Sequence, residues 1–283
     1  MSGILYICAT PIGNLKDISE RVLETLSEAD IIAAEDTRVT RRLLSHFDIH
    51  TKLTSYHEHN RFEKADALIE MLRDGKNIAL VTDAGTPVIS DPGDVLVARC
   101  AQEGIKVTSL PGASAVVTAC TLAHFNTGRF VFEGFLPANN KKSEREKRLS
   151  MIAEETRAVV LYEAPHRLLK TLSLLKEVLD EKRQIALCRE LTKIHEEVIR
   201  GTIDEMIDIH KNKEPRGEYV IVIEGRSEEE LKKERALEWE GLSIDEHVEM
   251  MIKSGVSKMD AMKIVAKERG ISKREVYKVM NEK

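Results

Sequence analysis

The feature that most constrains the fold of this chain is a loop-like stretch, Asp83–Gly93, that follows a short apolar run. The run, residues 77–82, has the composition of a buried parallel strand. Residues 94–104 have the pattern of a helix, for which we expect Asp94 as the N-cap and Gly104 as the C′ residue. The stretch is longer than the roughly 2–6 residues that a plain connection needs. Because ligands bind outside the carboxyl ends of strands in open α/β sheets, it predicts a ligand-binding loop on such a sheet.

The composition of this stretch also favours a ligand over a plain turn. Gly85 allows a backbone to approach a ligand closely, while Pro87 and Pro92 restrict the path of the chain. Asp83, the first residue after the strand, can accept hydrogen bonds from ribose hydroxyls or an amino group. A stiff turn with capping Asp residues is the alternative interpretation, and the length of the stretch argues against it.

Apolar runs alternate with helical patterns up to about residue 123, which predicts a parallel sheet covered by helices. The expected strands are residues 4–8, 31–34, 53–55, 77–82 and 105–110, and the expected helices are residues 18–29, 39–47, 61–73, 94–104 and 114–123. Since the carboxyl ends of parallel strands share one edge, we expect the loops that follow the five strands to converge on one crevice. These loops are Pro11–Asn14, Glu35–Arg38, Tyr56–Asn60, Asp83–Gly93 and Pro111–Ser114.

From about Arg129 the later strands have few helices between them, which predicts a mixed sheet. The expected strands are residues 130–135, 158–162, 185–188, 197–199 and 218–223. Thr202 and Glu205 have the spacing of a capping box that opens a helix. The alternation in the last of these strands is typical of a half-buried strand.

From about residue 227 the chain becomes first acidic and then basic. Ser243, Ser257 and Ser272 each have an acidic residue three positions later, which predicts three short helices, with Gly255 and Gly270 as natural stops. The last two helices have the spacing of a helix-turn-helix, and the last is net basic, so we expect nucleic-acid contact by this segment. A small helical cap is the alternative.

The bulk composition bounds the function more loosely. The chain has 283 residues and a net charge of −5, so nucleic-acid contact must come from local basic patches. The 4 cysteines form no Cys-x-x-Cys pair and no cation precedes Lys16, so we expect buried reduced thiols in a cytoplasmic protein. There is no Gly-x-Gly pair, no Walker A motif and no cluster with metal-ligand spacing, so we expect no metal.

Seven short blocks, in order between residues 3 and 226, carry a family resemblance. They are Ala9–Leu15, Ala34–Arg38, Tyr56–Asn60, Asp83–Gly93, Phe132–Pro137, Ala164–Arg167 and Arg189–Lys193. On these blocks the chain resembles the tetrapyrrole methylase superfamily, in the branch of the bacterial 16S ribosomal RNA ribose 2′-O-methyltransferases I. Thr82 stands where the family pattern has Ser, and Ala113 where it has Pro. Residues 120–125 depart further, which affects the wall of the cofactor pocket.

This resemblance implies two α/β domains, residues 1–115 with the parallel sheet and 116–226 with the mixed sheet. The small helical domain expected for residues 227–283 rests on the local patterns of that segment, which the resemblance does not cover. The resemblance also implies S-adenosylmethionine in the cleft between the α/β domains, and usually a homodimer. The implied reaction is methylation of the ribose 2′-hydroxyl of one cytidine in the decoding region of the small-subunit RNA. The family pattern carries the cofactor contacts over to Pro11, Asp83, Gly85, Thr86, Ser114, Ala115, Tyr162, Leu191 and Gly217.

A ribose hydroxyl is a poor nucleophile, so we expect a base or a hydrogen-bond acceptor at the cleft. Asp36, His57 and Glu133 are the candidates on strand-end loops, and we favour His57 or Asp36, oriented by Asn60 and Arg38. In the alternative interpretation, Asp36 caps a helix and forms an internal ion pair, and His57 is solvated.

Local basic residues are the expected contacts of an RNA substrate. Lys141, Lys142, Arg145, Lys147 and Arg148 form a charged run that can equally be a solvated helix face. The other expected RNA contacts are Arg38, Arg167, Arg189, Lys193, Lys273 and Arg274. With aromatic residues at only 4% of the chain, few platforms for base stacking are expected.

Three other functions compete with RNA methylation. A tetrapyrrole C-methyltransferase would share the fold, but it needs neither the basic run nor the basic tail. A non-catalytic ribosome assembly factor would not need the intact Asp83–Gly93 loop or the pair Ser114 and Ala115. A phosphohydrolase at the Asp-rich loop would require a divalent metal.

Overall fold

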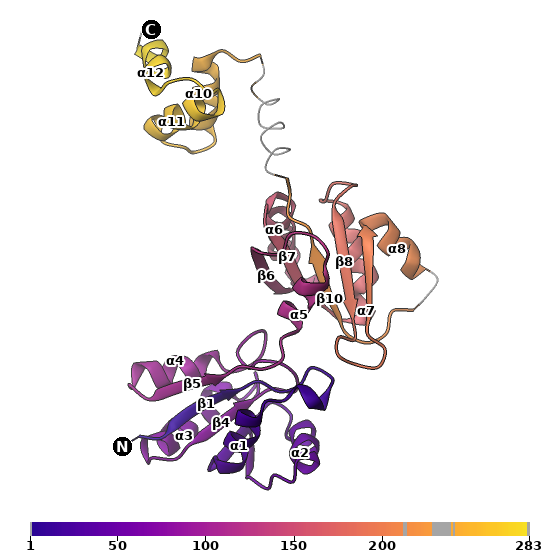
Figure 1. Cartoon of the computed structure of the whole chain (residues 1–283). Coiled ribbons are helices and arrows are strands. Elements are labelled where there is room, and N and C mark those ends of the chain that lie inside the picture. Colours follow the sequence, from indigo (N-terminus) through magenta and orange to yellow (C-terminus); the bar gives the residue numbers. More distant parts are fainter. Residues whose placement is uncertain (1, 212–213, 228–238, 240, 282–283) are drawn as a thin grey trace. The chain divides into compact units, whose positions relative to one another are not determined.

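The computed structural model describes residues 2–211, 214–227, 239 and 241–281 (Figure 1). The contacts within the chain divide it into two compact units. The first comprises Met1–Ala153 and Arg157–Glu224 and contains two sheets, and the second comprises Glu154–Thr156 and Gly225–Lys283 and contains the C-terminal helices. The division into three domains at residues 115 and 226 stays a prediction.

The first sheet has five parallel strands in the order β3-β2-β4-β1-β5, which confirms the expected parallel sheet. Its strands are β1 (Ile4–Cys8), β2 (Ile31–Ala34), β3 (Leu53–Ser55), β4 (Ile78–Val81) and β5 (Lys106–Leu110). The helices between them are α1 (Glu20–Glu28), α2 (Thr37–His46), α3 (Arg61–Arg73) and α4 (Asp94–Gln102), with the short 3-10 helix η1 (Leu15–Asp17) before α1.

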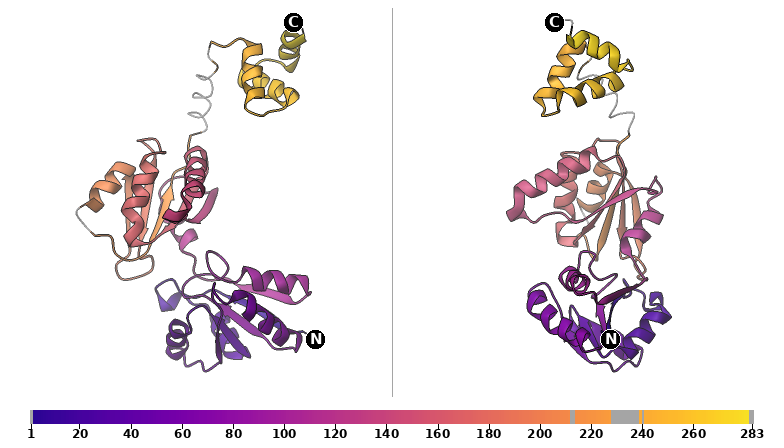
Figure 2. Two further views of the ribbon diagram at one scale, coloured as in Figure 1. Left: turned by 180° about the vertical axis from the view of Figure 1, so that it is seen from behind. Right: turned by 90° about the vertical axis from the view of Figure 1, so that its left-hand side faces the viewer.

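Helices cover both faces of this sheet (Figures 1 and 2). On one face, α3 and α4 pack on Leu5, Ile78 and Leu80, together with other side chains of the strands. On the other face, α1 and α2 pack on the alternate positions, such as Cys8 and Ile32. Because both of their faces are covered, the three inner strands β1, β2 and β4 are almost continuous apolar runs, whereas the edge strands β3 and β5 are more polar and more exposed.

The second sheet has the order β6-β7-β10-β8-β9, in which only β6 and β7 pair in parallel. This confirms the expected mixed sheet. The strands are β6 (Phe130–Phe135), β7 (Ala158–Glu163), β8 (Gln184–Arg189), β9 (Glu197–Thr202) and β10 (Tyr219–Ile223). The expectation that β10 is half-buried is wrong, because this strand lies in the centre of the sheet and all of its residues are buried.

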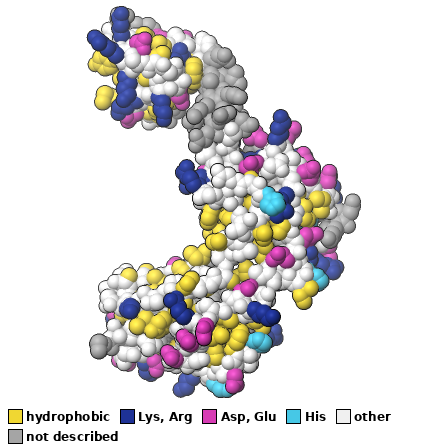
Figure 3. Space-filling model, viewed as in Figure 1, with side chains coloured by type: hydrophobic (Ala, Val, Ile, Leu, Met, Phe, Trp, Pro, Cys, Tyr) yellow, Lys and Arg dark blue, Asp and Glu magenta, His cyan; other side chains and the backbone are white. Residues whose placement is uncertain are grey.

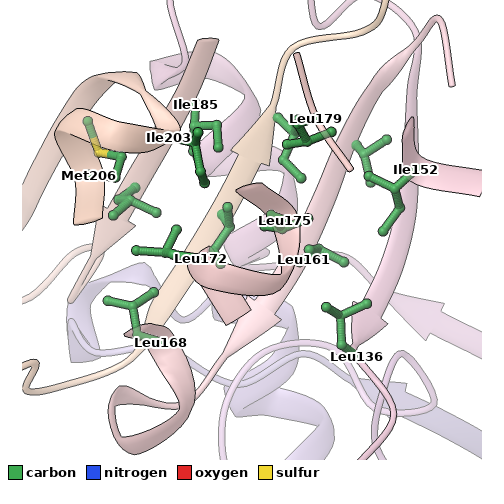
Figure 4. Packing of buried hydrophobic residues seen from close by; sticks show 14 of the residues in the cluster. Leu136, Ile152, Leu161, Leu168, Leu172, Leu175, Leu179, Ile185, Ile203 and Met206 are labelled. Atoms are coloured by element: carbon green, nitrogen blue, oxygen red, sulfur yellow. The ribbon is translucent and has the colours of Figure 1, made fainter. Parts of the chain in front are cut away.

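Helices also cover both faces of the second sheet. One face carries α6 (Lys142–Glu154), α7 (Pro165–Lys176) and α8 (Ile203–Lys211), whose leucines and Met206 pack on β7, β8 and β10 (Figure 4). The other face carries α5 (Ala115–Leu122), which follows β5 in the chain but packs on β8 and β10. The start of α5 therefore lies where the chain passes from one sheet to the other.

Two capping predictions have different outcomes. Thr202 and Glu205 do form the expected reciprocal hydrogen bonds at the start of α8. The expectation that Asp94 caps α4 is wrong, because Asp94 is the first helical residue and Gly93 is the N-cap, with φ of 151°. The chain needs a residue without a Cβ at that cap, which the capping preference of Asp does not reveal.

The second unit has its own small core. Its helices α10 (Ile244–Lys253), α11 (Lys258–Glu268) and α12 (Lys273–Asn281) begin after the three predicted serines and pack around Val248, Val265 and Val276. Lys and Arg side chains stand out from the face of this unit that Figure 3 shows. In the part of the chain that the structure describes, no helix is long and apolar enough to cross a membrane.

The conformation of Gly93 gives a stability prediction. A Cβ at Gly93 would lie 2.6 Å from Cγ2 of Val88, at a φ that L-residues rarely adopt. We expect Gly93→Ala to lower the free energy of unfolding by about 2–4 kcal/mol in urea titrations. The control is Gly104→Ala, where φ is 66° but the space is open, so that we expect a loss of only about 1–2 kcal/mol. Equal losses in the two variants would contradict the steric argument.

Candidate functional site

A cavity of about 640 Å³ lies within the first unit, at the carboxyl ends of β1, β2 and β4. Its volume is in the range of small-molecule and cofactor sites. Residues from both sheets contribute to its wall. The lining residues are Ile12, Glu35, Thr82, Asp83, Ala84, Gly85, Thr86, Ile89, Ser90, Asp91, Ser114, Ala115, Phe135, Tyr162, Glu163, Ala164, Pro165, His166, Cys188, Leu191, Glu218, Tyr219 and Val220.

Backbone hydrogen bonds hold the loop after β1 against the loop after β4. The N–H of Thr10 donates to the carbonyl of Gly85 over 2.8 Å, and the N–H of Gly85 donates back over 3.1 Å. The hydroxyl of Thr10, which is buried, donates to the carbonyl of Thr82 over 3.1 Å. The two loops therefore form one continuous wall, in which Gly85 has a φ of 83° that favours glycine.

The register of β2 and β4 brings polar side chains together at the strand ends. Ala34 pairs with Val81, so the next residues along the two strands, Glu35 and Thr82, lie side by side. The Thr82 hydroxyl donates to Oε2 of Glu35 over 2.7 Å. One residue further, the backbone N–H of Asp36 donates to Oδ1 of Asp83 over 3.1 Å.

The loop from Gly85 to Gly93 is strained. Val88 and Ser90 have φ values of 78° and 64°, and for a β-branched residue such as valine this conformation is a genuine outlier. Backbone strain of this kind costs of order 1–3 kcal/mol per residue and persists only where the surroundings over-determine the conformation. Here the half-buried side chain of Val88 packs against the core of the first sheet, which stabilises this conformation of the loop.

The second sheet contributes an aromatic wall. The ring of Tyr162 makes edge contacts with Phe132 and Phe135, at centroid distances of 4.9 and 5.6 Å. Burial raises the pKa of the Tyr162 hydroxyl to about 12, with a smaller contribution from the nearby Asp91. Burial likewise raises the pKa of the Cys188 thiol to about 12.

The electrostatics of the cavity are dominated by carboxylates. Burial raises the pKa of Asp91 to about 6, and the neighbouring charges of Glu35 and Asp83 add to the effect. The pKa of Asp83 is raised as well, mainly by burial and further by Glu35 and Asp36. These carboxylates carry an unfavourable excess of negative charge, and a cationic ligand would relieve it.

Most of the predicted cofactor residues lie together in this cavity. Asp83, Gly85, Thr86, Ser114, Ala115, Tyr162 and Leu191 line it. Pro11 and Gly217 are outside the lining set. Gly217 packs against Glu190, whose side chain leaves no room for a Cβ at residue 217. The contacts of these residues with a cofactor stay predictions.

The predicted catalytic residues lie outside the lining of the cavity. Asp36 forms a 2.6 Å ion pair with Arg38, and the hydrogen bonds of Arg38 lower the pKa of Asp36 to about 2. His57 and Asn60 are hydrogen-bonded to each other. Their loop follows β3, which is the edge strand of the sheet, with β2 between it and β4. Among the residues that the structure describes, four of the five expected loops contribute to the lining, and the loop after β3 does not.

Several lining residues were not among the predicted ones, notably Glu35, Asp91, Phe135 and His166. Glu35 and Asp91 both belong to the recognised blocks, but a capping role explained them equally well. The signal that distinguishes Glu35 is its place immediately after β2, in register with Thr82 across the pair of strands. Glu133, the third catalytic candidate, is not in the lining of the cavity. Its carboxylate lies 3.8 Å from the guanidinium of Arg148.

The predicted RNA-binding cations fall into two groups. In the first group, the side chain is buried or bound by other residues of the fold. Arg145 is buried, and Arg167 contacts Glu163 and donates to the Leu136 carbonyl. Arg189 pairs with Glu197, and Lys193 pairs with Glu190 and Glu218. The others are exposed: Arg38, Lys141, Lys142, Lys273 and Arg274. Arg145 therefore cannot contribute to an exposed basic stripe, and the exposed group is better suited to reach a phosphate backbone.

Comparisons with known proteins fit this architecture. A profile of the Tetrapyrrole (Corrin/Porphyrin) Methylases matches residues 4–207. Among solved structures, a cobalt precorrin-4 methyltransferase superposes with a TM-score of 0.60 at 18% identity, covering 78% of this chain and 94% of its own. A diphthine synthase gives a TM-score of 0.61 at 16% identity, covering 80% and 91%. At these identities the structural likeness shows the fold alone.

Curated relatives are much more similar in sequence. A protein of Bacillus subtilis (strain 168), named ribosomal RNA small subunit methyltransferase I, is 46% identical over 97% of this chain and 93% of its own length. A protein of the same name from Synechocystis sp. is 45% identical over 98% and 97%. One from Thermotoga maritima is 43% identical over 79% of this chain and 99% of its own length.

The chain belongs to the tetrapyrrole methylases, in the branch whose curated members are named ribosomal RNA small subunit methyltransferase I. It is therefore a methyltransferase that uses S-adenosylmethionine. The cavity fits this cofactor, because its desolvated carboxylates complement a sulfonium and an ammonium group. The N-terminus of α5, capped by Ser114, presents backbone N–H groups that suit a carboxylate. Small residues such as Gly85 and Ala115 permit close approach.

The raised pKa of Asp91 gives a prediction about stability and pH. Because the folded state prefers the protonated carboxyl, Asp91 contributes stability below its unfolded pKa of 3.8 and loses it as the pH rises through about 6. We expect Asp91→Asn to stabilise the fold by about 1 kcal/mol at pH 8, allowing for partial exposure, and to give no gain at pH 4. Urea unfolding at the two pH values measures this, with Asp94→Asn as control. A gain independent of pH would contradict the argument.

Proposed function

We propose that this protein transfers a methyl group from S-adenosylmethionine to the 2′-hydroxyl of a cytidine ribose in the decoding region of 16S ribosomal RNA. The observation that carries the proposal is the similarity, over nearly the whole chain, to proteins named ribosomal RNA small subunit methyltransferase I. The ribose position and the cytidine rest on the resemblance of the seven sequence blocks.

The residues of the cavity suit a reaction that depends on positioning. When bound, the cofactor supplies a methyl group on a positively charged sulfur. Backbone hydrogen bonds restrict the wall formed by Thr10 and Gly85, and the loop up to Asp91 has a constrained backbone. The loops therefore lose little further conformational freedom when a molecule binds. Holding two reactants in the correct geometry contributes about 7–11 kcal/mol to lowering a barrier. In this proposal, Asp83, Thr86 and Ser114 bind the polar ends of the cofactor, and the ribose enters beside Phe135, an exposed residue of the lining.

Exposed cations provide the contact with the RNA backbone. Lys141 and Lys142 lie at the start of α6, and Lys273 and Arg274 lie at the start of α12. Phosphate contacts of this kind position a substrate without reading its sequence. The exposed ring of Tyr277 beside Lys273 and Arg274 adds a surface on which a base can stack.

The proposal includes a cytoplasmic homodimer acting on the small subunit or its RNA. The first alternative, methylation of a tetrapyrrole, is supported only by the fold it shares with distant structures. The second, a non-catalytic assembly factor, does not account for the hydrogen-bonded cavity wall.

A direct assay tests the proposed reaction. With labelled S-adenosylmethionine, we expect label on a ribose of small-subunit RNA from cells that lack this modification, and none on a tetrapyrrole. Asp83→Ala removes a cavity carboxylate, so we expect kcat/KM to fall at least about 100-fold. Asp74→Ala, an exposed change at the end of α3, serves as control. Label on the tetrapyrrole would overturn the substrate, and binding of the cofactor without transfer would favour the assembly factor.

The contribution of the C-terminal helices is testable through salt dependence. We expect the double change Lys273→Glu and Arg274→Glu to weaken RNA binding and to reduce the slope of log K against log salt by about 1.5. The matched control is Lys76→Glu with Lys106→Glu, exposed cations at the amino ends of β4 and β5, where no binding is proposed. A filter-binding titration at several salt concentrations gives both slopes. Equal slopes for the two double variants would contradict a specific role of α12.

A further inference from the structure

A bulge in strand β6 lies next to a residue of the cavity lining. The pairing of β6 with β7 passes from Phe132 and Val160 to Gly134 and Leu161, so that β6 has one extra residue, Glu133, over this step. Bulges re-aim side chains, and they are over-represented beside active sites. This bulge belongs to one of the recognised sequence blocks, and none of the expected cofactor contacts lies in that block.

The bulge determines the direction of the Phe135 side chain. In a regular strand, side chains alternate between the two faces, so Phe132 and Phe135 would lie on opposite faces of the sheet. Because of the extra residue, both rings instead contact the ring of Tyr162, at centroid distances of 4.9 and 5.6 Å. Phe135 pairs with Tyr162 across the two strands, and both residues line the cavity. The bulge thus brings to the cavity an aromatic ring that regular pairing would turn away from it.

Two arginines hold the backbone on either side of Phe135. Nη1 of Arg148 donates to the carbonyl of Glu133 over 2.9 Å, and Nη2 of Arg167 donates to the carbonyl of Leu136 over 2.7 Å. Arg167 is itself held by an ion pair, over 3.3 Å, with a buried carboxylate at the end of β7. These bonds stabilise the conformation of the segment that carries the ring.

The bulge also packs closely against the strained loop after β4. Gly134 has a φ of 64°, and a Cβ at this residue would lie 3.2 Å from Oγ of Ser90. Glycine adopts this conformation without strain and leaves room for the hydroxyl. Ser90 and Phe135 both line the cavity, so the contact holds two parts of its wall together.

Phe135 stays accessible in spite of these contacts. Among the described residues, the Phe and Tyr side chains that line the cavity are Phe135, Tyr162 and Tyr219. Phe135 is 47% exposed, whereas Tyr162 is half-buried and Tyr219 is buried. An aromatic ring that is held in place and still accessible suits stacking with a planar group.

We propose that Phe135 is the platform on which the base of the acceptor nucleotide stacks, and that Arg148 and Arg167 are positioning residues that hold it there. The proposal rests on the proposed function and adds to it how the nucleotide is held. Proteins that act on single-stranded RNA stack unpaired bases on aromatic side chains, and every base has a π-face for this contact. Because a base is bonded directly to its ribose, a base on Phe135 places that ribose beside the cavity.

The adenine of the cofactor is the other planar group that reaches this cavity. Leu191 and Val220 give the lining a buried apolar surface, at 5% exposure each, which suits a cofactor enclosed by the protein. Phe135 instead presents nearly half of its surface to the outside. That position suits a macromolecular substrate, which brings its base to the cavity from solvent.

Single-turnover methylation of small subunits tests the platform. Phe135→Leu keeps an apolar side chain but removes the π-face, so we expect kcat/KM to fall about 5- to 100-fold. Phe135→Trp restores an aromatic face and should stay within about threefold of the wild-type value. The matched control is Phe130→Leu, since Phe130 is 39% exposed at the start of the same strand but lies outside the lining. Thermal unfolding of each variant checks the fold.

The positioning role of Arg148 has its own test. Arg148→Met removes the hydrogen bond to the Glu133 carbonyl, so kcat/KM should fall about tenfold, and Arg148→Lys should recover part of it. The slope of log K against log salt for RNA binding should keep its wild-type value, because the proposal gives Arg148 no phosphate contact. A reduced slope would make Arg148 an RNA contact and contradict the positioning role.

Two readouts do not depend on methylation of RNA. Calorimetry should show that Phe135→Leu binds S-adenosylmethionine with a Kd within about threefold of the wild-type value. The chain has 6 phenylalanines, so the fluorine NMR spectrum of protein labelled with fluorophenylalanine is simple enough to assign with the Leu variants. With the cofactor bound, a single-stranded RNA oligonucleotide of the decoding region should shift the Phe135 resonance and leave that of Phe130 in place.

The outcomes are distinguishable. If Phe135→Leu retains kcat/KM on small subunits that the wild-type enzyme methylates, the platform is overturned and the proposed function stands. A loss of cofactor affinity of about tenfold would place adenine on Phe135, and a changed oligomeric state in sedimentation would place a second copy there. Either result overturns the proposal. If the wild-type protein methylates no RNA, the proposed function fails, and a Phe135 resonance that RNA does not shift overturns base binding as well.

Discussion

The pairing of β2 with β4 is the interaction on which the site depends. It places Glu35 beside Thr82 at the ends of two buried strands, where the Thr82 hydroxyl donates to Glu35. One residue further, the backbone N–H of Asp36 donates to Asp83. A shift of one residue in this register would turn every side chain of β2 to the opposite face. Since both faces are packed by helices, such a shift would expose apolar surface on one side and crowd the other. The chemistry of the cavity is therefore stabilised by the core of the first sheet.

Much of the architecture could be predicted from the sequence. The strands of the first sheet, the mixed second sheet and the caps of the C-terminal helices all follow from local patterns, because burial and capping act over a few residues. What local patterns do not contain is the order of strands. The sequence alone suggests that the loop after β3 joins the others, but β3 is the edge strand and carries His57 and Asn60 away from the cavity. The central place of β10, and hence its burial on both faces, was hidden for the same reason.

The same distinction applies to the charged residues. Asp36, Arg38 and Asp91 are all polar residues on strand-end loops, and sequence reasoning selected Asp36 as a candidate base without singling out Asp91. The structure separates them by environment: Asp36 has an arginine partner and solvent, whereas Asp91 has a hydroxyl, two carboxylates and partial burial. Partners that are distant in sequence decide which carboxylate retains affinity for a proton. For the basic residues, likewise, only the fold shows that Arg145 and Arg189 are bound internally while Lys273 and Arg274 are exposed.

The buried thiol of Cys188 has a consequence for the fidelity of methyl transfer. A thiolate is a far better nucleophile than a ribose hydroxyl, and Cys188 lines the cavity that we propose as the cofactor site. Burial raises the pKa of this thiol to about 12, so that it stays protonated at neutral pH. Desolvation by the surrounding apolar side chains thus keeps Cys188 in its weakly nucleophilic form, in which it competes poorly as a methyl acceptor.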